Sequence, residues 1–149
     1  LRTQSDVDSL REALADGTID IVATDHAPHP AEDKECEWSA AAFGMTGLES
    51  ALAIVNTTMV ATGRMKWADV ARTMSSAPAQ IGRVSTHGRP IEVGEPANLV
   101  LFDPSSEVVI DRALTSSKSR NNPYHAMTLR GRVVATFLRG QQTYRLEHA

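Results

Sequence analysis

An apolar run that ends abruptly in titratable residues constrains the fold of this chain more than any other feature. Residues 19–24 read Ile-Asp-Ile-Val-Ala-Thr, and residues 25–29 read Asp-His-Ala-Pro-His. A β-branched run of this kind predicts a buried strand, and the residues after it would bring acid, base and metal-binding side chains to one edge of a sheet. The catalytic residues of α/β barrels lie at that edge. The pattern therefore predicts part of an active site at residues 25–29.

These residues can form only a part of such a site. A closed metal site needs about four ligands, whereas the segment offers one Asp and two His. An Asp after a strand is also a common turn or helix N-cap residue, and Asp25 is interpreted as catalytic because of the His-Ala-Pro-His that follows it. We expect His26 to pack beside Asp25 and orient it rather than to bind a metal. The sequence thus indicates a portion of an enzyme.

Composition excludes several other classes of protein. The 149 residues are 42% hydrophobic and 22% charged, as is typical of a soluble globular chain, and the 18 acidic residues outnumber the 15 basic ones, so no nucleic-acid partner is expected. No apolar stretch approaches the ~20 residues that span a bilayer. The single cysteine, Cys36, fits a reducing compartment. We therefore expect a cytoplasmic protein without membrane contact, and the absence of an initiator Met suggests a processed or truncated chain.

The first half of the chain combines helical patterns with one strand pattern. Residues 3–16 have apolar positions at helical spacing, with Ser5 as the candidate N-cap and Gly17 after the last turn. The strand at 18–24 follows, and residues 27–45 form a long irregular stretch that is typical of a lid or binding loop. Further helices are expected at 47–62 and 67–75, with a short helical turn from residue 78. A helix followed by a buried strand is half of a βαβ repeat, which indicates the α/β class and a parallel sheet.

After about residue 85 the pattern changes to short β-rich runs separated by glycine and proline. The expected strands are 98–102, 108–110, 127–129 and 132–138. These runs favour antiparallel strands of a small module. We therefore predict one unit at residues 1–85 and a second at residues 86–149.

Three segments together resemble a known enzyme family. They are residues 24–29 (Thr-Asp-His-Ala-Pro-His), 43–49 (Phe-Gly-Met-Thr-Gly-Leu-Glu) and 117–124 (Ser-Lys-Ser-Arg-Asn-Asn-Pro-Tyr). In this order they resemble the dihydroorotases of the longer, bacterial type, which belong to the amidohydrolase superfamily. Residues 94–103 are similar to a returning β-sandwich strand of such enzymes. The resemblance covers nearly the whole chain.

The resemblance implies a fold that is incomplete as a domain. Residues 1–85 would be the last strand and flanking helices of a metal-dependent (β/α)8 barrel, and residues 86–149 would be part of a C-terminal β-sandwich. A full barrel needs ~250 residues, more than this chain has. Family members carry a His-x-His pair and further metal ligands upstream, and the chain has no His-x-His pair. Most zinc ligands are therefore expected outside this chain.

The resemblance also implies roles for four residues. Asp25 falls on the family's aspartate, which touches the zinc site and takes a proton from the attacking water, so it is expected to be both catalytic and metal-binding. His29 matches a substrate-contacting histidine. Phe43 and Gly44 match the loop pair whose backbone meets the pyrimidine ring, although for Phe43 plain packing is an equal alternative. A glycine suits this role because it lacks a Cβ that would block close approach.

The implied activity is that of the complete enzyme. It would reversibly cyclise N-carbamoyl-L-aspartate to dihydroorotate in de novo pyrimidine biosynthesis, as a zinc enzyme with a small-molecule substrate and a homodimer as one candidate assembly. This portion alone is expected to be inactive. Two alternatives stay open at this point: a cyclic amidohydrolase of the dihydropyrimidinase or allantoinase type, and a non-catalytic dihydroorotase-like assembly subunit.

Overall fold

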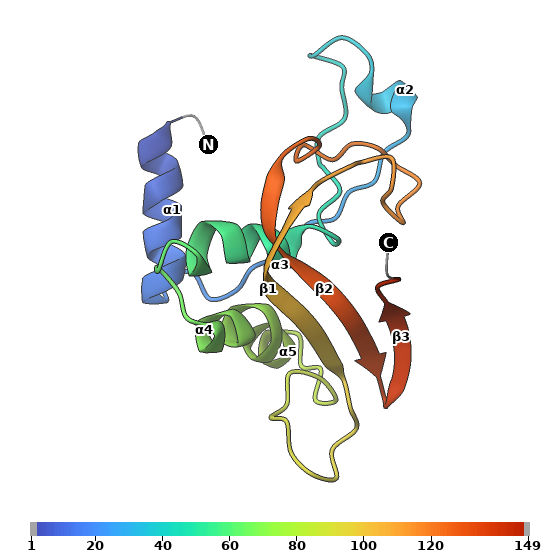
Figure 1. Cartoon of the computed structure of the whole chain (residues 1–149). Helices are drawn as coiled ribbons and strands as arrows, with labels where there is room; N and C mark the ends of the chain where they lie inside the picture. Colours follow the sequence, from blue (N-terminus) through green and yellow to red (C-terminus); the bar gives the residue numbers. More distant parts are fainter. Residues whose placement is uncertain (1–2, 148–149) are drawn as a thin grey trace.

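The computed structural model describes residues 3–147. Figure 1 shows helices on one side, a curved sheet on the other, and a set of loops that carries α2 away from both. The helices are α1 (Gln4–Asp16), α2 (Ala31–Lys34), α3 (Ala51–Val55), η1 (Asn56–Val60), α4 (Trp67–Ala71), η2 (Arg72–Ser76) and α5 (Ala77–Ile81), where η marks a π-helix, and the strands are β1 (Leu99–Val109), β2 (Thr128–Leu138) and β3 (Gln141–Arg145).

Helix α1 confirms the predicted first helix and corrects its cap. Its N-cap is Thr3, whose hydroxyl accepts a hydrogen bond from the Asp6 N–H, while the Asp6 carboxylate accepts one from the Thr3 N–H. This reciprocal pair satisfies two donors that a helix start otherwise leaves free. Ser5, the expected cap, lies inside the helix, and Gly17 ends it with φ +88°.

The prediction of a strand at residues 18–24 is wrong. The segment is extended but has no strand ladder, and the Val22 N–H donates to the Thr73 carbonyl oxygen at 3.0 Å instead of to a strand. The only sheet-like contact nearby is an isolated parallel bridge between His26 and Met45. A strand needs neighbouring strands to take up its backbone hydrogen bonds, and this segment instead passes beside helices (Figure 1).

The two predicted helices after residue 47 are confirmed, with π-helical turns inside them. Helix α3 continues directly into η1, and α4 continues through η2 into α5. In both helices a threonine hydroxyl donates back to the carbonyl oxygen four residues earlier, Thr57 to Ala53 at 2.7 Å and Thr73 to Asp69 at 2.9 Å. Such back-bonding often bends a helix.

A small apolar core holds these helices together. Its buried members are Val55, Met59, Met65 and Val70. Half-buried apolar residues from α1 and from the extended segment pack against it, including Leu14 and Val22. The extended segment is therefore fixed by hydrophobic contact even though it lacks a ladder.

The sheet is antiparallel, with strand order β1-β2-β3. The four short strands predicted from the sequence join in pairs into β1 and β2, and β3 was missed because its residues are polar and exposed on both faces. A register shift after Asp103 lets β1 continue through Pro104. The Asp103 carboxylate accepts hydrogen bonds from the Ser106 and Ser105 hydroxyls and the Ser105 N–H, which lower its pKa to about 2.

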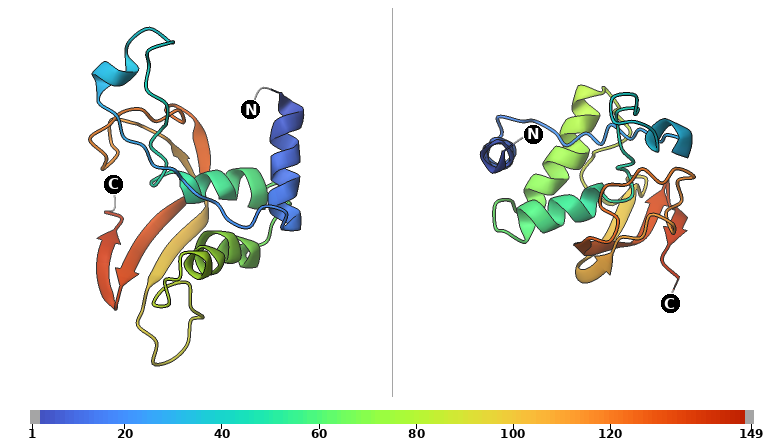
Figure 2. Two further views of the ribbon diagram at one scale, coloured as in Figure 1. Left: turned by 180° about the vertical axis from the view of Figure 1, so that it is seen from behind. Right: turned by 90° about the horizontal axis from the view of Figure 1, so that it is seen from above.

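The sheet packs on the helices through a buried amide. The Asn56 side chain, 2% exposed, donates to the carbonyl oxygens of Pro104 at 3.0 Å and Arg130 at 2.9 Å, and so joins η1 to both β1 and β2. Figures 1 and 2 agree that α3 and α4 lie on one side of β1 and β2. Residues on both sides of position 85 are therefore in contact, and the proposed boundary there stays a prediction.

The expectation of a β-sandwich is met only in part. One sheet is present among residues 3–147, and the second layer of the predicted β-sandwich stays a prediction. No helix in this range is both long enough and apolar enough to cross a membrane.

Gly131 allows the sheet to lie close to the helix, and replacing it with alanine tests this packing. Its φ is +102°, and a Cβ built on it would lie 2.1 Å from Phe102 Cζ and 2.8 Å from Asn56 Nδ2. Gly140 has a similar φ of +81° and open space around it, so it is the matched control. We expect Gly131→Ala to lower the free energy of unfolding by about 1–3 kcal/mol more than Gly140→Ala, measured by urea denaturation. Equal losses in the two variants would contradict this packing.

Candidate functional site

The three segments singled out in the sequence lie against one another in the structure. The first contact is made by His26, whose Nδ1 accepts hydrogen bonds from the N–H groups of Gly47 at 3.0 Å and Leu48 at 3.3 Å. The Ala27 N–H donates to the Met45 carbonyl oxygen at 2.9 Å beside it. These bonds fasten the segment after the extended run to the turn before α3. His26 is therefore a packed histidine, as expected, but its Nδ1 holds this turn rather than Asp25.

Asn121 adds the third segment. Its side-chain N–H donates to the Ala27 carbonyl oxygen at 2.8 Å and to that of Gly44 at 3.4 Å, and its Oδ1 accepts from the His29 N–H at 3.4 Å. Its own backbone carbonyl accepts from the Thr46 N–H at 3.1 Å. One residue of the loop between β1 and β2 thus holds the backbone of the other two segments.

Glu49 fixes the middle of the same loop. Its two carboxylate oxygens accept from the N–H groups of Ser116 at 2.9 Å and Ser117 at 3.2 Å. No role was expected for Glu49 or Asn121 from the sequence. Their positions inside the second and third segments mark them as candidates. The atoms that they contact could not be predicted, because the contacts join loops far apart in the sequence.

Asp25 is exposed and has a strained backbone. Its φ is +42°, in the left-handed region that residues other than glycine seldom adopt. Strain of this kind is often found at functional sites, where the surrounding structure holds it. The residues described at positions 3–147 offer its carboxylate no hydrogen bond or ion pair. An exposed carboxylate without a partner can accept a proton or bind a cation.

His29 and Gly44 lie side by side. The His29 ring is half-buried, its Nδ1 is 3.8 Å from the Asp33 carboxylate, and its Nε2 is 3.6 Å from the place where a Gly44 Cβ would be. Gly44 has φ +101°, and such a Cβ would also lie 2.6 Å from Ala27 Cβ. Phe43 is 97% exposed, so packing does not explain it within the part of the chain that the structure describes.

A basic cavity opens beside these residues. Its volume is about 410 Å³, and His29 and Gly44 line it together with Lys34, Lys118, Arg120 and Asn121. Asp25 and Phe43 do not line it. The structure therefore brings His29 and Gly44 into one cavity wall and leaves Asp25 on the adjacent surface.

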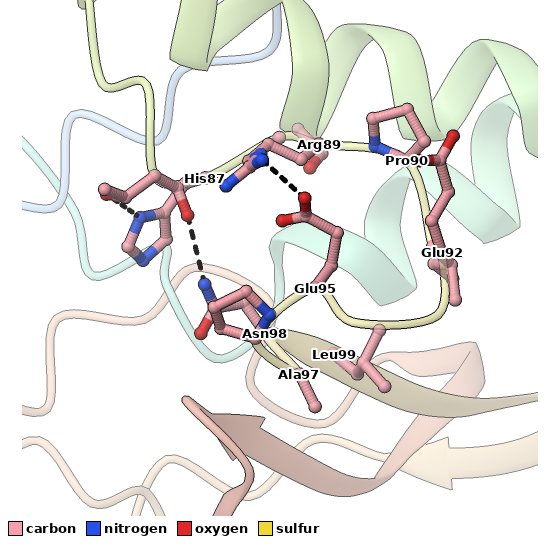
Figure 3. A pocket seen from close by; sticks show the side chains of 13 residues that line it. His87, Arg89, Pro90, Glu92, Glu95, Ala97, Asn98 and Leu99 are labelled. Atoms are coloured by element: carbon pink, nitrogen blue, oxygen red, sulfur yellow. Dashed lines mark hydrogen bonds and ion pairs between the residues drawn. The ribbon is translucent and has the colours of Figure 1, made fainter.

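A second, smaller cavity lies far from the three segments. It has a volume of about 140 Å³ and is lined by Ser75 and by residues 86–92 and 95–99 (Figure 3). An ion pair between Arg89 and Glu95 crosses it, and Glu95 Oε2 is buried without a hydrogen-bond partner. None of the predicted site residues lines it.

The described residues do not form a metal site by themselves. Between positions 3 and 147, no three His, Cys, Asp or Glu side chains come together as a set of metal ligands. Asp25 fits as one oxygen ligand of a larger site, because its carboxylate is exposed and unpaired.

Solved structures similar to this chain carry the names hydantoinase and dihydropyrimidinase. An L-hydantoinase (dihydropyrimidinase) from Arthrobacter aurescens superimposes with a TM-score of 0.88 at 30% identity, over 96% of this chain and 32% of that protein. A D-hydantoinase (dihydropyrimidinase) from a Thermus species superimposes with a TM-score of 0.86 at 28% identity, over 97% of this chain and 32% of its own.

Sequence comparison finds closer relatives. A dihydroorotase of Streptomyces coelicolor is 61% identical over 143 residues, which are 96% of this chain and 33% of that protein. A dihydroorotase of Mycobacterium tuberculosis is 52% identical over 145 residues, 97% of this chain and 34% of that protein. The chain thus spans about a third of the length of the curated relatives it matches. The profile described as Amidohydrolase family matches residues 1–143, so the chain belongs to the amidohydrolase family.

Proposed function

We propose that this chain is part of a dihydroorotase, which reversibly cyclises N-carbamoyl-L-aspartate to dihydroorotate in de novo pyrimidine biosynthesis in the cytoplasm. The observation that carries the proposal is the hydrogen-bonded contact of the three segments through His26 and Asn121. Identities of 52–61% to proteins named dihydroorotase support it. In this proposal the remaining part of the barrel lies outside these 149 residues.

Asp25 is the proposed proton carrier. In the hydrolytic direction it accepts a proton from the water that attacks the ring amide carbonyl, and it returns the proton to the ring nitrogen as the C–N bond breaks. Its exposure supports this role, as does the fact that no side chain or backbone group between positions 3 and 147 bonds to its carboxylate.

A zinc ion is the proposed cofactor, with Asp25 as one ligand and the other ligands outside this chain. When bound, zinc would polarise the substrate carbonyl and acidify the attacking water. His29 would present Nε2 to a substrate oxygen, because its Nδ1 lies on the side of Asp33. With Nε2 protonated, the ring would donate a hydrogen bond to that oxygen. The Phe43–Gly44 backbone would contact the pyrimidine ring, and the φ of +101° at Gly44 keeps that approach open.

A hydantoinase-type activity is the second candidate, because the similar solved structures carry that name. Their identities of 28–30% are well below those to the dihydroorotases, which favours the first candidate. Both candidates open a cyclic amide, and their substrates differ in charge, because dihydroorotate carries a carboxylate that dihydrouracil and hydantoin lack. The full-length protein is therefore to be assayed on dihydroorotate, dihydrouracil and hydantoin. Turnover of the two uncharged rings with none of dihydroorotate would overturn the proposal.

Replacing Asp25 tests the proton carrier. In the full-length protein, we expect Asp25→Asn to lower kcat for dihydroorotate by at least about 100-fold, because an amide cannot accept the proton. Asp20→Asn is the matched control, since Asp20 is also exposed on the same extended segment, and its kcat should stay within about twofold. Similar losses in the two variants would assign the effect to charge in general.

Replacing Gly44 tests the substrate loop. The added Cβ of Gly44→Ala would collide with Ala27 and displace the loop, so we expect the KM for dihydroorotate to rise about 10-fold. Gly63→Ala introduces a side chain at a comparable φ of +75° with open space around it, and it should leave KM unchanged. Steady-state kinetics of both variants in the full-length protein give the comparison. An unchanged KM in Gly44→Ala would remove this loop from the proposed site.

The isolated 149-residue chain is expected to be inactive and to bind zinc poorly. The reason is that its described residues supply Asp25 as the one proposed ligand and form no cluster of three metal-binding side chains. Zinc titration by calorimetry and a ring-opening assay with added zinc measure both properties. Steady turnover that Asp25→Asn abolishes would show this expectation to be wrong.

A further inference from the structure

The short helix α2 is bonded to the proposed substrate loop by one side chain. Lys34 Nζ donates to the carbonyl oxygens of Ala42 at 2.7 Å and Gly44 at 3.0 Å. The Asp33 backbone carbonyl accepts from the Ala42 N–H at 2.9 Å next to it. The residue between the two accepting carbonyls is Phe43, so the Lys34 ammonium holds the backbone on both sides of that residue.

The same helix also faces His29. The Asp33 carboxylate lies 3.8 Å from Nδ1 of His29, which is four residues earlier in the chain, just before the helix. Helix α2 therefore contacts all of the substrate-side groups proposed above: the His29 ring through Asp33, and the backbone around Phe43 and Gly44 through Lys34. Figure 1 shows α2 well away from the helices and the sheet, so it has no part in the core.

The hydrogen bonds from the Lys34 ammonium to the two carbonyl oxygens are strong because the donor is charged. An ammonium donor forms charge-assisted hydrogen bonds, which are about twice as strong as neutral ones. A helix of four residues is unstable alone, so α2 and the loop support each other through these bonds. Among residues 3–147, the Phe43 N–H and carbonyl and the Gly44 N–H have no hydrogen-bond partner. Lys34 thus takes up the flanking carbonyls and leaves these groups available to a ligand.

We propose that Lys34 is a positioning residue for substrate recognition, which acts by holding the carbonyls of Ala42 and Gly44 so that the Phe43–Gly44 backbone faces the substrate. The inference rests on the proposed function and adds to it a residue that sequence analysis did not single out. Lys34 is not required to touch the substrate, because two of its three N–H donors are already used by the loop.

The test compares three variants of the full-length protein. Lys34→Met keeps the length of the side chain and removes the ammonium, and Lys34→Arg restores several donors that can reach two carbonyls. Lys66→Met is the matched control, because Lys66 is exposed just before α4 and lines none of the cavities beside the three segments. Each variant is measured by steady-state kinetics on dihydroorotate and by amide hydrogen exchange over residues 40–46.

We expect Lys34→Met to raise the KM for dihydroorotate about 10-fold, with a smaller change in kcat, and to speed hydrogen exchange in residues 40–46. Lys34→Arg should recover most of both effects, and Lys66→Met should show neither. The proposal is overturned if Lys34→Met leaves KM or the exchange unchanged, or if Lys34→Arg is as impaired as Lys34→Met. If the unmodified protein does not turn over dihydroorotate, the proposed function fails, and the exchange measurement alone still supports or overturns the holding of the loop by Lys34.

Discussion

The bonding of Asn56 to both long strands is the contact on which the rest of the structure depends. A buried amide without partners would cost free energy, and here two carbonyl oxygens, of Pro104 and Arg130, satisfy it. Because the accepting carbonyls belong to β1 and β2, this side chain fixes the sheet on the helices, together with Thr57, whose Oγ1 accepts from the Arg130 N–H at 2.7 Å. Gly131 permits the close approach. The loop between the two strands is then carried to the side of the extended segment, where Asn121 reaches Ala27.

The candidate site is an assembly of backbone segments held by polar side chains. His26, Glu49 and Asn121 each bond to main-chain groups of a segment other than their own, and Lys34 bonds to main-chain groups further along its own loop. Such contacts specify direction as well as distance, which hydrophobic packing does not. This explains how loops with little buried apolar surface hold a defined geometry. It also explains why Asp25 can keep an unfavourable φ of +42°, since the residues that follow it are bonded on both sides.

Prediction from sequence succeeded where local residue patterns decide the outcome. Helix α1 and the helices after residue 47 follow from apolar spacing and a closing glycine. The long loop at 27–45 follows from its irregular pattern, although the short helix α2 inside it was not predicted. It failed at residues 18–24, where a β-branched run predicts a strand but the described chain offers no neighbouring strand to pair with. It also divided β1 and β2 into shorter strands, since Pro104 and Gly131 usually interrupt a strand. In the structure β1 continues past Pro104 through a bulge at Asp103, and β2 continues through Gly131, which packs against Phe102.

Residue identity and spacing alone determined which segments carry chemistry, which helices form and which family the chain resembles, because these depend on patterns within a few turns of sequence. Only the tertiary structure decided which atoms meet. The bond of His26 to Gly47 spans 21 positions and that of Asn121 to Ala27 spans 94. Contacts over such distances leave no local pattern, since they depend on how the sheet packs on the helices.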